Sequence, residues 1–140
     1  MTIRDNKSNK SGDFLGRTLT PQQYKVGRQK GTEAPFSGKY VSNHDEGIYR
    51  CVGCEQELFK SDTKFDSASG WPSFTDPVNR THINLEEDNS LNHRRVEVSC
   101  SKCGFHLGHV FPDGPAEKGG QRYCINSVCL EFSPKPRGLS

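Results

Sequence analysis

Two Cys-x-x-Cys pairs constrain the fold of this 140-residue chain more than any other feature of its sequence. The first pair is Cys51 and Cys54, and the second is Cys100 and Cys103. Two intervening residues let both sulfurs reach one ion from a tight turn, and four thiolates complete a tetrahedral zinc shell with no position left for water. The sequence therefore predicts one structural Zn²⁺ per chain, which would tie together two turns separated by residues 55–99.

Disulfides, free thiols and a thioredoxin-like redox motif are the alternative explanations of these pairs. The segment Met1–Lys10 is polar and lacks the apolar stretch of a signal peptide, so we expect a cytoplasmic, reducing compartment, where paired cysteines more often bind metal. No βαβ pattern surrounds either pair, which argues against the redox motif. The formal net charge is only +2, and no apolar run approaches the ~20 residues of a membrane span, so we expect no nucleic-acid or membrane partner.

The length of the chain favours one domain. Only 31% of its residues are hydrophobic, and a core this lean gains from a metal staple. The start of the chain is rich in Asn, Lys, Ser and Asp, and residues 133–140 carry two prolines. We therefore expect a flexible segment at residues 1–12, a single domain at 13–135 and a flexible tail at 136–140.

Local patterns predict a mainly β domain with a helical N-terminal arm. Thr18–Arg28 holds the convincing helix, which Gly27 or Gly31 could end. Its start has an N-cap residue, a proline at the first helical position and a capping-box glutamine, namely Thr20, Pro21 and Gln23. Beyond it, short apolar stretches alternate with turn residues, which is typical of antiparallel strands. The predicted strands are Gly47–Val52, Leu58–Lys60, Thr63–Asp66, His82–Glu86, Arg94–Ser99, His106–Phe111 and Arg122–Phe132.

Cys124 stands outside the two pairs and is the candidate nucleophile. In a strand, Arg122, Cys124 and Asn126 share one face, and Tyr123 and Ile125 take the other. A cation on the same face favours the thiolate, which is the reactive form of cysteine. A buried and inert cysteine is the alternative interpretation.

Two further segments carry candidate site residues. His106 and His109 could each supply an acid, a base or an orienting group, and Asp113 could orient one imidazole. A second metal site, a hydrogen-bonded loop and a Pro-Asp-Gly turn are the alternatives for these residues. Trp71, on a loop with Gly and Pro, could either line a site for an apolar ligand group or cap the core.

Taken together, residues 32–127 resemble the methionine-R-sulfoxide reductases. The resemblance implies two antiparallel β-sheets with short N-terminal helices and a structural four-cysteine zinc site far from the active site. The motifs that carry it are Thr32-Glu33-Ala34-Pro35-Phe36-Ser37-Gly38-Lys39-Tyr40, Gly47-Ile48-Tyr49-Arg50-Cys51-Val52-Gly53-Cys54, Ser69-Gly70-Trp71-Pro72-Ser73-Phe74, His106-Leu107-Gly108-His109-Val110-Phe111-Pro112-Asp113-Gly114-Pro115 and Arg122-Tyr123-Cys124-Ile125-Asn126-Ser127.

The same resemblance implies a reaction and a role for each candidate. The R epimer of methionine sulfoxide, in oxidised proteins and as the free amino acid, would be reduced in repair of oxidative damage. Cys124 would attack the sulfoxide sulfur and become a sulfenic acid. His109 is the first choice for the acid, with His106 beside it. The other implied roles are substrate binding by Trp71 and Phe111, polar positioning by Asn126 and Asp113, and support of the thiolate by Arg122.

One departure from the family concerns the regeneration of the thiol. Many members carry a resolving cysteine two residues before the tryptophan, where this chain has Ser69. Cys129 would face away from Cys124 in an unbroken strand. We therefore expect thioredoxin or another external thiol as the reductant, and we expect the protein to act as a monomer. A zinc-ribbon binding module and a cysteine hydrolase with Cys124, a histidine and Asn126 are the alternative functions.

Overall fold

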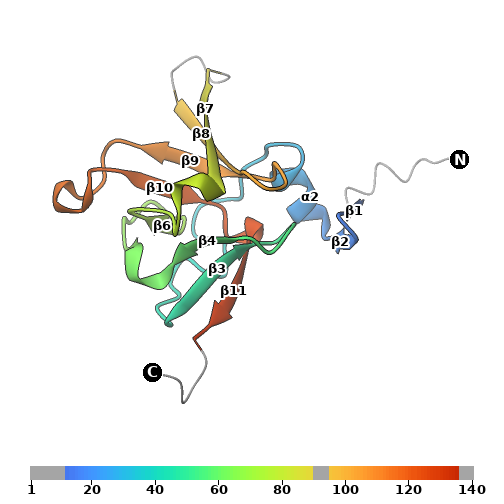
Figure 1. Ribbon diagram of the computed structural model, residues 1–140, viewed down its shortest axis with the longest axis horizontal. Coiled ribbons are helices and arrows are strands. Elements are labelled where there is room, and N and C mark those ends of the chain that lie inside the picture. The colour runs from blue at the N-terminus through green and yellow to red at the C-terminus, as the bar shows by residue number, and fades with distance from the viewer. Residues whose placement is uncertain (1–11, 90–94, 136–140) are drawn as a thin grey trace, which may run out of the picture.

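The computed structural model describes residues 12–89 and 95–135, and most of its strands belong to two antiparallel sheets (Figure 1). The larger sheet contains β5 (Lys64–Phe65), β6 (Ser73–Phe74), β7 (Ile83–Asp88), β8 (Arg95–Cys100), β9 (His106–Phe111) and β10 (Arg122–Ile125). The smaller contains β3 (Gly47–Cys51), β4 (Glu57–Lys60) and β11 (Leu130–Pro134). Their strand orders are β5-β6-β10-β9-β8-β7 and β11-β3-β4, which confirms the predicted fold class.

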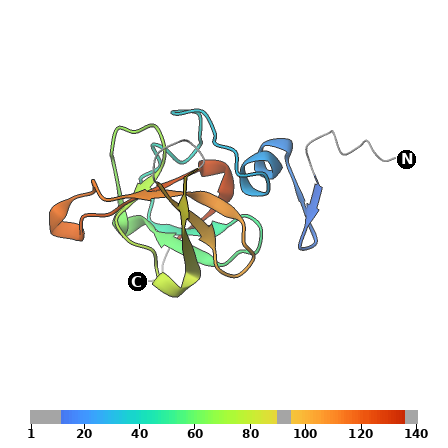
Figure 2. The same ribbon diagram turned by 90° about the horizontal axis from the view of Figure 1, so that it is seen from above.

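A short N-terminal arm precedes the sheets. It consists of a hairpin of β1 (Gly12–Phe14) and β2 (Arg17–Leu19), followed by α2 (Pro21–Gly27). Figure 2 shows this arm at one end of the molecule, as does Figure 1. Four 3-10 turns complete the described residues, namely η1 (Ser61–Thr63), η2 (Arg80–His82), η3 (Ala116–Lys118) and η4 (Ser127–Cys129). Within residues 12–89 and 95–135, no helix is long and apolar enough to cross a membrane.

Helix α2 has the start that the sequence predicted, but its end has another cause. The Thr20 hydroxyl accepts from the Gln23 main-chain N–H at 3.1 Å, and the Gln23 side chain accepts from Thr20 N–H at 2.8 Å. The helix ends at Gly27, and the next residue, Arg28, keeps a right-handed conformation. A Cβ at Gly27 would clash with the Phe105 ring, so this glycine is required for packing and not for a left-handed cap. Several short helices were expected, whereas the described residues form one α-helix.

Aromatic residues from both sheets form the core between them. Tyr49 and Phe59 come from the smaller sheet, and Phe74 comes from the larger one; each is fully buried. The Phe74 ring lies 4.4 Å from that of Phe59 and 5.2 Å from that of Tyr49, centroid to centroid. Tyr123 on β10 continues the cluster, with its ring 5.8 Å from Phe59. Since each buried aromatic removes a large apolar area from water, this cluster stabilises the packing of the two sheets against each other.

The predicted strand Arg122–Phe132 is wrong, because the chain changes sheets within it. Strand β10 ends at Ile125 in the larger sheet, η4 follows, and β11 begins at Leu130 in the smaller sheet. The apolar residues on both sides of the break read as one continuous strand in the sequence. Strand alternation therefore does not decide which way Cys129 faces relative to Cys124.

The other predicted strands match observed strands within a few residues, and three very short strands were not predicted. These are β1, β2 and β6, which have only two or three residues each. Such short segments leave no room for an alternating pattern. Residues 1–11 and 136–140, to which the expected flexible ends refer, and Arg94 lie outside the described residues.

Candidate active site and metal centre

The four paired cysteines converge at the junction of the two sheets. Cys51 ends β3 and Cys100 ends β8, while Cys54 and Cys103 lie in the turns that follow. The sulfurs of Cys51 and Cys103 are 3.6 Å apart, those of Cys54 and Cys100 are 3.5 Å apart, and all four lie within 4.8 Å of one another. A tetrahedral zinc–thiolate shell has sulfurs about 3.8 Å apart. All six cysteines are free, and this group of four could hold a metal ion.

Both knuckles use the same backbone turn. The N–H of Glu55 donates to Cys51 O at 2.7 Å, and that of Gly104 donates to Cys100 O at 2.8 Å. Glu55 and Gly104 have φ of +69° and +81°, whereas a Cβ at Gly53 would meet the Phe14 ring at 2.7 Å. Gly53 is thus a packing residue and not a turn residue.

The cluster also shows why a cation would be favourable. Hydrogen bonds with the neighbouring thiols of Cys100 and Cys103 raise the pKa of Cys51. Four sulfurs at this spacing repel one another when they are all ionised, and a divalent cation supplies the missing charge.

A second site surrounds Cys124 on the larger sheet, in a pocket of about 190 Å³. Strand β10 lies between β6 and β9 (Figure 1), and Cys124 pairs with His109 of β9 and Ser73 of β6. Alternation along β10 turns Tyr123 and Ile125 into the core and Cys124 toward the pocket. The described residues that line it are Thr32, Ser69, Trp71, Arg95, Gly108, His109, Phe111, Arg122, Cys124 and Asn126.

Six of the eight candidate residues meet in this pocket, and two do not. His106 and Asp113 are absent from the described residues that line it, as are the four paired cysteines. Strands β9 and β10 come very close at Gly108, which lines the pocket. A Cβ at this position would clash with the Cys124 carbonyl oxygen. Gly108 permits this close approach, and the direct pairing of Cys124 with His109 places their side chains on the same face of the sheet.

Burial is the largest influence on the pKa of the Cys124 thiol. It raises the pKa of Cys124, while the charge of Arg122 and a hydrogen bond from Ser69 lower it less. Arg122 was expected to favour the thiolate, and it acts in that direction without outweighing burial. Asp113 holds the Arg122 guanidinium through two hydrogen bonds of 2.8 and 3.2 Å and contacts neither histidine, so the suggested role in orienting an imidazole is wrong.

Both histidines are oriented by carboxylates that the sequence analysis missed. His109 Nε2 lies 2.9 Å from Asp88 Oδ2, and His106 Nδ1 lies 2.7 Å from Glu97 Oε2. Burial lowers the pKa of His109, and the hydrogen bond to Asp88 partly offsets that shift. His106 is buried, and its Nε2 has no hydrogen-bond partner among the described residues. The His106 ring packs edge-on to that of His109, at 5.6 Å.

Glu33 is the other residue that sequence reasoning missed, and it connects three parts of the site. Its buried carboxylate accepts the main-chain N–H groups of Ser127 and Val128 at 2.9 and 3.0 Å. Its own N–H donates to Asn126 Oδ1, and its carbonyl accepts from Trp71 Nε1, both at 3.0 Å. Burial raises the pKa of Glu33, and the two N–H donors oppose that shift. No local pattern could have revealed a residue whose partners lie far along the chain.

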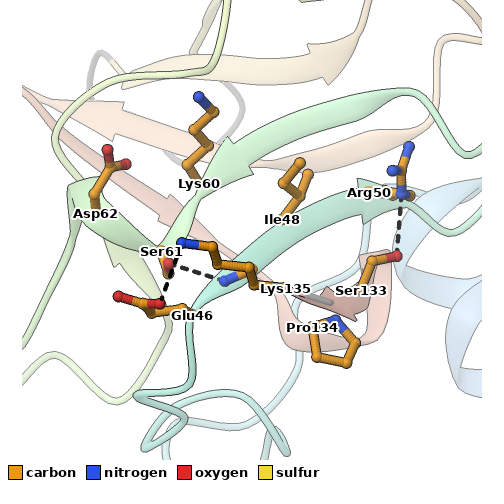
Figure 3. Close-up of a pocket in the computed structure, with 10 residues that line it drawn as sticks. Glu46, Ile48, Arg50, Lys60, Ser61, Asp62, Ser133, Pro134 and Lys135 are labelled. Atoms are coloured by element: carbon orange, nitrogen blue, oxygen red, sulfur yellow. Dashed lines mark hydrogen bonds and ion pairs between the residues drawn. The ribbon is translucent and has the colours of Figure 1, made fainter. Parts of the chain in front are cut away.

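A larger cavity of about 500 Å³ lies on the smaller sheet and carries different chemistry (Figure 3). It is lined by charges of both signs, among them Arg50 and Lys60 with Glu46 and Asp62. Lys135 reaches Glu46 at 3.9 Å. This cavity shares no described lining residue with the Cys124 pocket, so its size does not make it the candidate active site.

Comparison with known proteins places the chain in a family. A family model described as the SelR domain matches residues 19–134. The chain belongs to this family, the MsrB methionine sulfoxide reductases. The peptide methionine sulfoxide reductase MsrB of Methanosarcina mazei is 59% identical over 131 residues, which cover 94% of this chain and 93% of that protein. That of Bradyrhizobium diazoefficiens is 53% identical over 131 residues and 94% of each chain.

A longer mouse relative and a solved structure are also similar to this chain. The mitochondrial methionine-R-sulfoxide reductase B3 of Mus musculus is 52% identical over 136 residues, covering 95% of this chain and 53% of that protein. The Mis18 Yippee-like domain superposes with a TM-score of 0.53 and 18% identity, over 66% of this chain and 99% of that one. This second likeness concerns the fold alone.

Replacing Glu33 by Gln is expected to destabilise the protein and to disturb Trp71. A glutamine amide cannot accept both N–H groups of η4, and an unsatisfied buried donor should cost about 2–4 kcal/mol of unfolding free energy. Denaturant unfolding measures the loss, and the fluorescence of the single tryptophan reports the change around Trp71. Glu117→Gln, at an exposed position, is the control. Equal stability of the two variants would contradict the role of Glu33.

Proposed function

We propose that the protein reduces the R epimer of methionine sulfoxide, both in oxidised proteins and as the free amino acid, with Cys124 as the nucleophile. The observation that carries the proposal is the Cys124 pocket, in which a cysteine, two aromatic rings and a carboxylate-bound histidine meet in a chain of the MsrB family. Preference for the R epimer is supported by the name of the mouse relative.

The lining of the pocket suits a sulfoxide side chain. Trp71 and Phe111 offer apolar surfaces for the S-methyl group, and Arg122 lies over the Phe111 ring at 4.6 Å. Trp71 is held in place through its indole N–H, which donates to the Glu33 carbonyl. The His109 imidazole lies on the same lining and can face the sulfoxide oxygen, while Asn126, whose amide is bound to the main chain, holds the pocket wall in place.

In the proposed step, one proton moves from the thiol to the sulfoxide oxygen. Burial favours the neutral forms of Cys124 and His109, so His109 takes the thiol proton as the sulfur attacks. The protonated imidazole then returns the proton to the departing oxygen. The sulfur–oxygen bond of the substrate breaks and a new one forms on Cys124, which yields methionine and a Cys124 sulfenic acid. Asp88 stabilises the imidazolium, and Glu97 holds His106 behind it.

The two alternative functions account for less of the structure. A cysteine hydrolase would need Asn126 to orient an imidazole, but its amide is bound to the main chain at Leu107 O and Glu33 N–H. A zinc-ribbon binding module would leave the Cys124 pocket without a purpose. The test that separates all three is reduction of the resolved R and S epimers with dithiothreitol, and then with thioredoxin. Equal use of both epimers would remove the stereochemical assignment.

Cys124→Ser is expected to abolish sulfoxide reduction, while Cys129→Ser keeps a single-turnover yield near that of the wild type. Cys129 is fully buried, and its sulfur donates to the His106 carbonyl at 3.0 Å, a bond that serine can replace. The measurement is methionine formed in one turnover without reductant, with dimedone to trap the sulfenic acid. Full activity of Cys124→Ser would end the proposed mechanism.

Asp88→Asn is expected to move the pH dependence of the single-turnover rate to lower pH. The hydrogen bond that His109 donates to the Asp88 carboxylate raises the pKa of His109, so the variant lowers that pKa further. Because His109 must be neutral to accept the thiol proton, the rate rises with pH through this pKa, and the rise shifts with it. Because the His109 imidazole is a weaker base in the variant, the maximal single-turnover rate reached at high pH should also be lower. Asp62→Asn, in the cavity on the smaller sheet, is the control, and an unchanged profile in Asp88→Asn would exclude His109 as the base.

We propose that the paired cysteines hold one Zn²⁺ whose role is structural. Its ligands would be Cys51, Cys54, Cys100 and Cys103, which fit a closed tetrahedral shell by their sulfur spacing. The ion would link the end of β3 to the end of β8 and thus the two sheets. It would take no part in the reaction.

Replacing Cys51 or Cys103 by Ser is expected to release the metal and lower the melting temperature, since metal binding contributes to folding free energy. Elemental analysis and thermal unfolding are the measurements. Cys129→Ser is the matched control, because it removes a buried thiol outside the cluster. Freshly purified protein without zinc, prepared free of chelators, would contradict the assignment.

We propose that an external thiol, from thioredoxin or a small molecule, attacks the Cys124 sulfenic acid directly. Ser69 occupies the resolving position, and its hydroxyl hydrogen-bonds the Cys124 sulfur. Strand alternation no longer argues against Cys129, but burial does: Cys129 is inaccessible, and burial raises the pKa of its thiol well above the ordinary value. The zinc cysteines would have to leave the metal to react.

Ser69→Cys is expected to supply a resolving thiol and to increase turnover with thioredoxin, because this side chain already contacts the Cys124 sulfur. Ser67→Cys is the control. It also adds a thiol, but at a residue that contacts Ser69, at 2.8 Å, and does not line the Cys124 pocket. Steady-state rates with thioredoxin and mass spectrometry after one turnover are the measurements. A quantitative Cys124–Cys129 disulfide in the wild-type protein would show that Cys129 is the resolver.

We also propose that the enzyme acts as a monomer in a reducing, cytoplasmic compartment. The candidate nucleophile, the candidate acid and the aromatic residues already meet in the Cys124 pocket without a partner, and all six cysteines are free. Sedimentation measurements at assay concentration test the monomer.

A further inference from the structure

An exposed apolar turn adjoins the Cys124 pocket. Ala34, Pro35 and Phe36 are all exposed, and Phe36 has 71% of its surface in solvent. A Cβ placed on Gly70 would meet Pro35 Cβ at 2.6 Å and the Phe36 ring at 3.1 Å, so the turn packs directly against Gly70. Because Gly70 lies between Ser69 and Trp71, which both line the pocket, the apolar surface continues up to its edge.

The backbone at Phe36 is strained as well as exposed. Ser37 N–H donates to Ala34 O at 3.3 Å, so Pro35 and Phe36 occupy the middle of a four-residue turn. Phe36 has φ of +64° at the third position of this turn, where glycine is favoured. A 2.7 Å bond from Phe36 N–H to Gly70 O holds the turn in place. Glycine would relieve both the strain and the exposure, so folding alone does not explain a phenylalanine here.

Leu15 is another exposed apolar residue with a left-handed backbone, and in its case the fold explains that conformation. It is 63% exposed with φ of +52°, and it precedes Gly16, which has φ of +79°. These two residues connect β1 to β2, and a two-residue hairpin requires two successive left-handed residues. The hairpin lies at one end of the molecule, away from β6 and β10 (Figures 1 and 2). Leu15 therefore matches Phe36 in exposure and conformation but lies apart from the pocket.

We propose that Phe36 contacts apolar side chains that flank the methionine sulfoxide of a protein substrate, which makes it a specificity-determining residue; this inference rests on the proposed function. A cavity of about 190 Å³ is smaller than the ~300–1,000 Å³ of drug-sized ligand sites, so it takes a single side chain and leaves the flanking residues outside. Methionine is commonly buried, and its oxidation disrupts the core around it. The chain segments exposed by that damage carry apolar side chains, which suit the Phe36 ring.

The experiment uses two capped pentapeptides, each with a central R-methionine sulfoxide, flanked either by glycines or by leucines. The wild type should show a kcat/KM about fivefold higher for the leucine peptide, through a lower KM, as burial of part of an aromatic ring provides. Phe36→Asn, which tolerates the left-handed turn, should bring the ratio toward one, and Phe36→Tyr should keep it. Leu15→Asn should behave as the wild type. Dithiothreitol serves as the reductant throughout.

The outcomes separate this inference from the function beneath it. A wild type that reduces neither peptide overturns the proposed function itself. A wild type that reduces both with equal kcat/KM, or a Phe36→Asn variant that keeps the wild-type ratio, overturns the role of Phe36. The role of Phe36 is also overturned if Phe36→Asn lowers kcat on both peptides and the melting temperature but leaves the ratio of the two kcat/KM values unchanged. Sedimentation of both proteins is the last arm: self-association lost in Phe36→Asn at an unchanged ratio would make the turn an interface between copies of this chain.

Discussion

Glu33 holds the short segment in which the chain passes from the larger sheet to the smaller one. Its carboxylate accepts the N–H groups of Ser127 and Val128, just where β10 has ended and β11 has not begun. A buried carboxylate needs such donors, and a turn with free N–H groups needs such an acceptor. Because the main chain of Glu33 also binds Trp71 and Asn126, the same residue that joins the sheets shapes the wall of the pocket.

Burial favours the neutral forms of the two groups that the proposed mechanism uses, Cys124 and His109. Burial raises the pKa of Cys124 and lowers that of His109, so neither carries a charge before the substrate arrives. Asp88 and Arg122 oppose these shifts and become most favourable when charge develops during the reaction. In the proposed mechanism the thiolate forms only together with the imidazolium, so the resting thiol would be protected from side reactions. The paired cysteines lie outside this pocket, so a metal there can stabilise the fold without altering the chemistry.

The contacts of Ser69 connect the fold to the question of regeneration. Ser69 lowers the pKa of Cys124 through a hydrogen bond, and its hydroxyl accepts from Ser67, which in turn contacts Ser73 at 2.7 Å. Hydroxyls can stabilise a thiolate by hydrogen bonding, but they cannot form a disulfide with a sulfenic acid. The place next to Cys124 therefore suits the first half of the proposed reaction, and in that proposal the thiol for the second half comes from outside the chain.

The sequence by itself determined the features that depend on short spacings. These are the two Cys-x-x-Cys knuckles, the capping box of α2, most of the strands, and the presence of Arg122, Cys124 and Asn126 on one pocket wall. Local geometry decides each of them, so a few neighbouring residues suffice. Its resemblance to a family supplied the roles of Trp71 and the histidines.

Only the tertiary structure decided which distant groups meet. It pairs His109 with Asp88, His106 with Glu97 and Arg122 with Asp113, and it breaks the predicted strand Arg122–Phe132. It also shows that burial changes the pKa of the Cys124 thiol more than the neighbouring Arg122 does. Glu33 lies more than 90 residues from the N–H groups that it accepts, and contacts at such separations follow from how the sheets pack and not from any local period of the sequence.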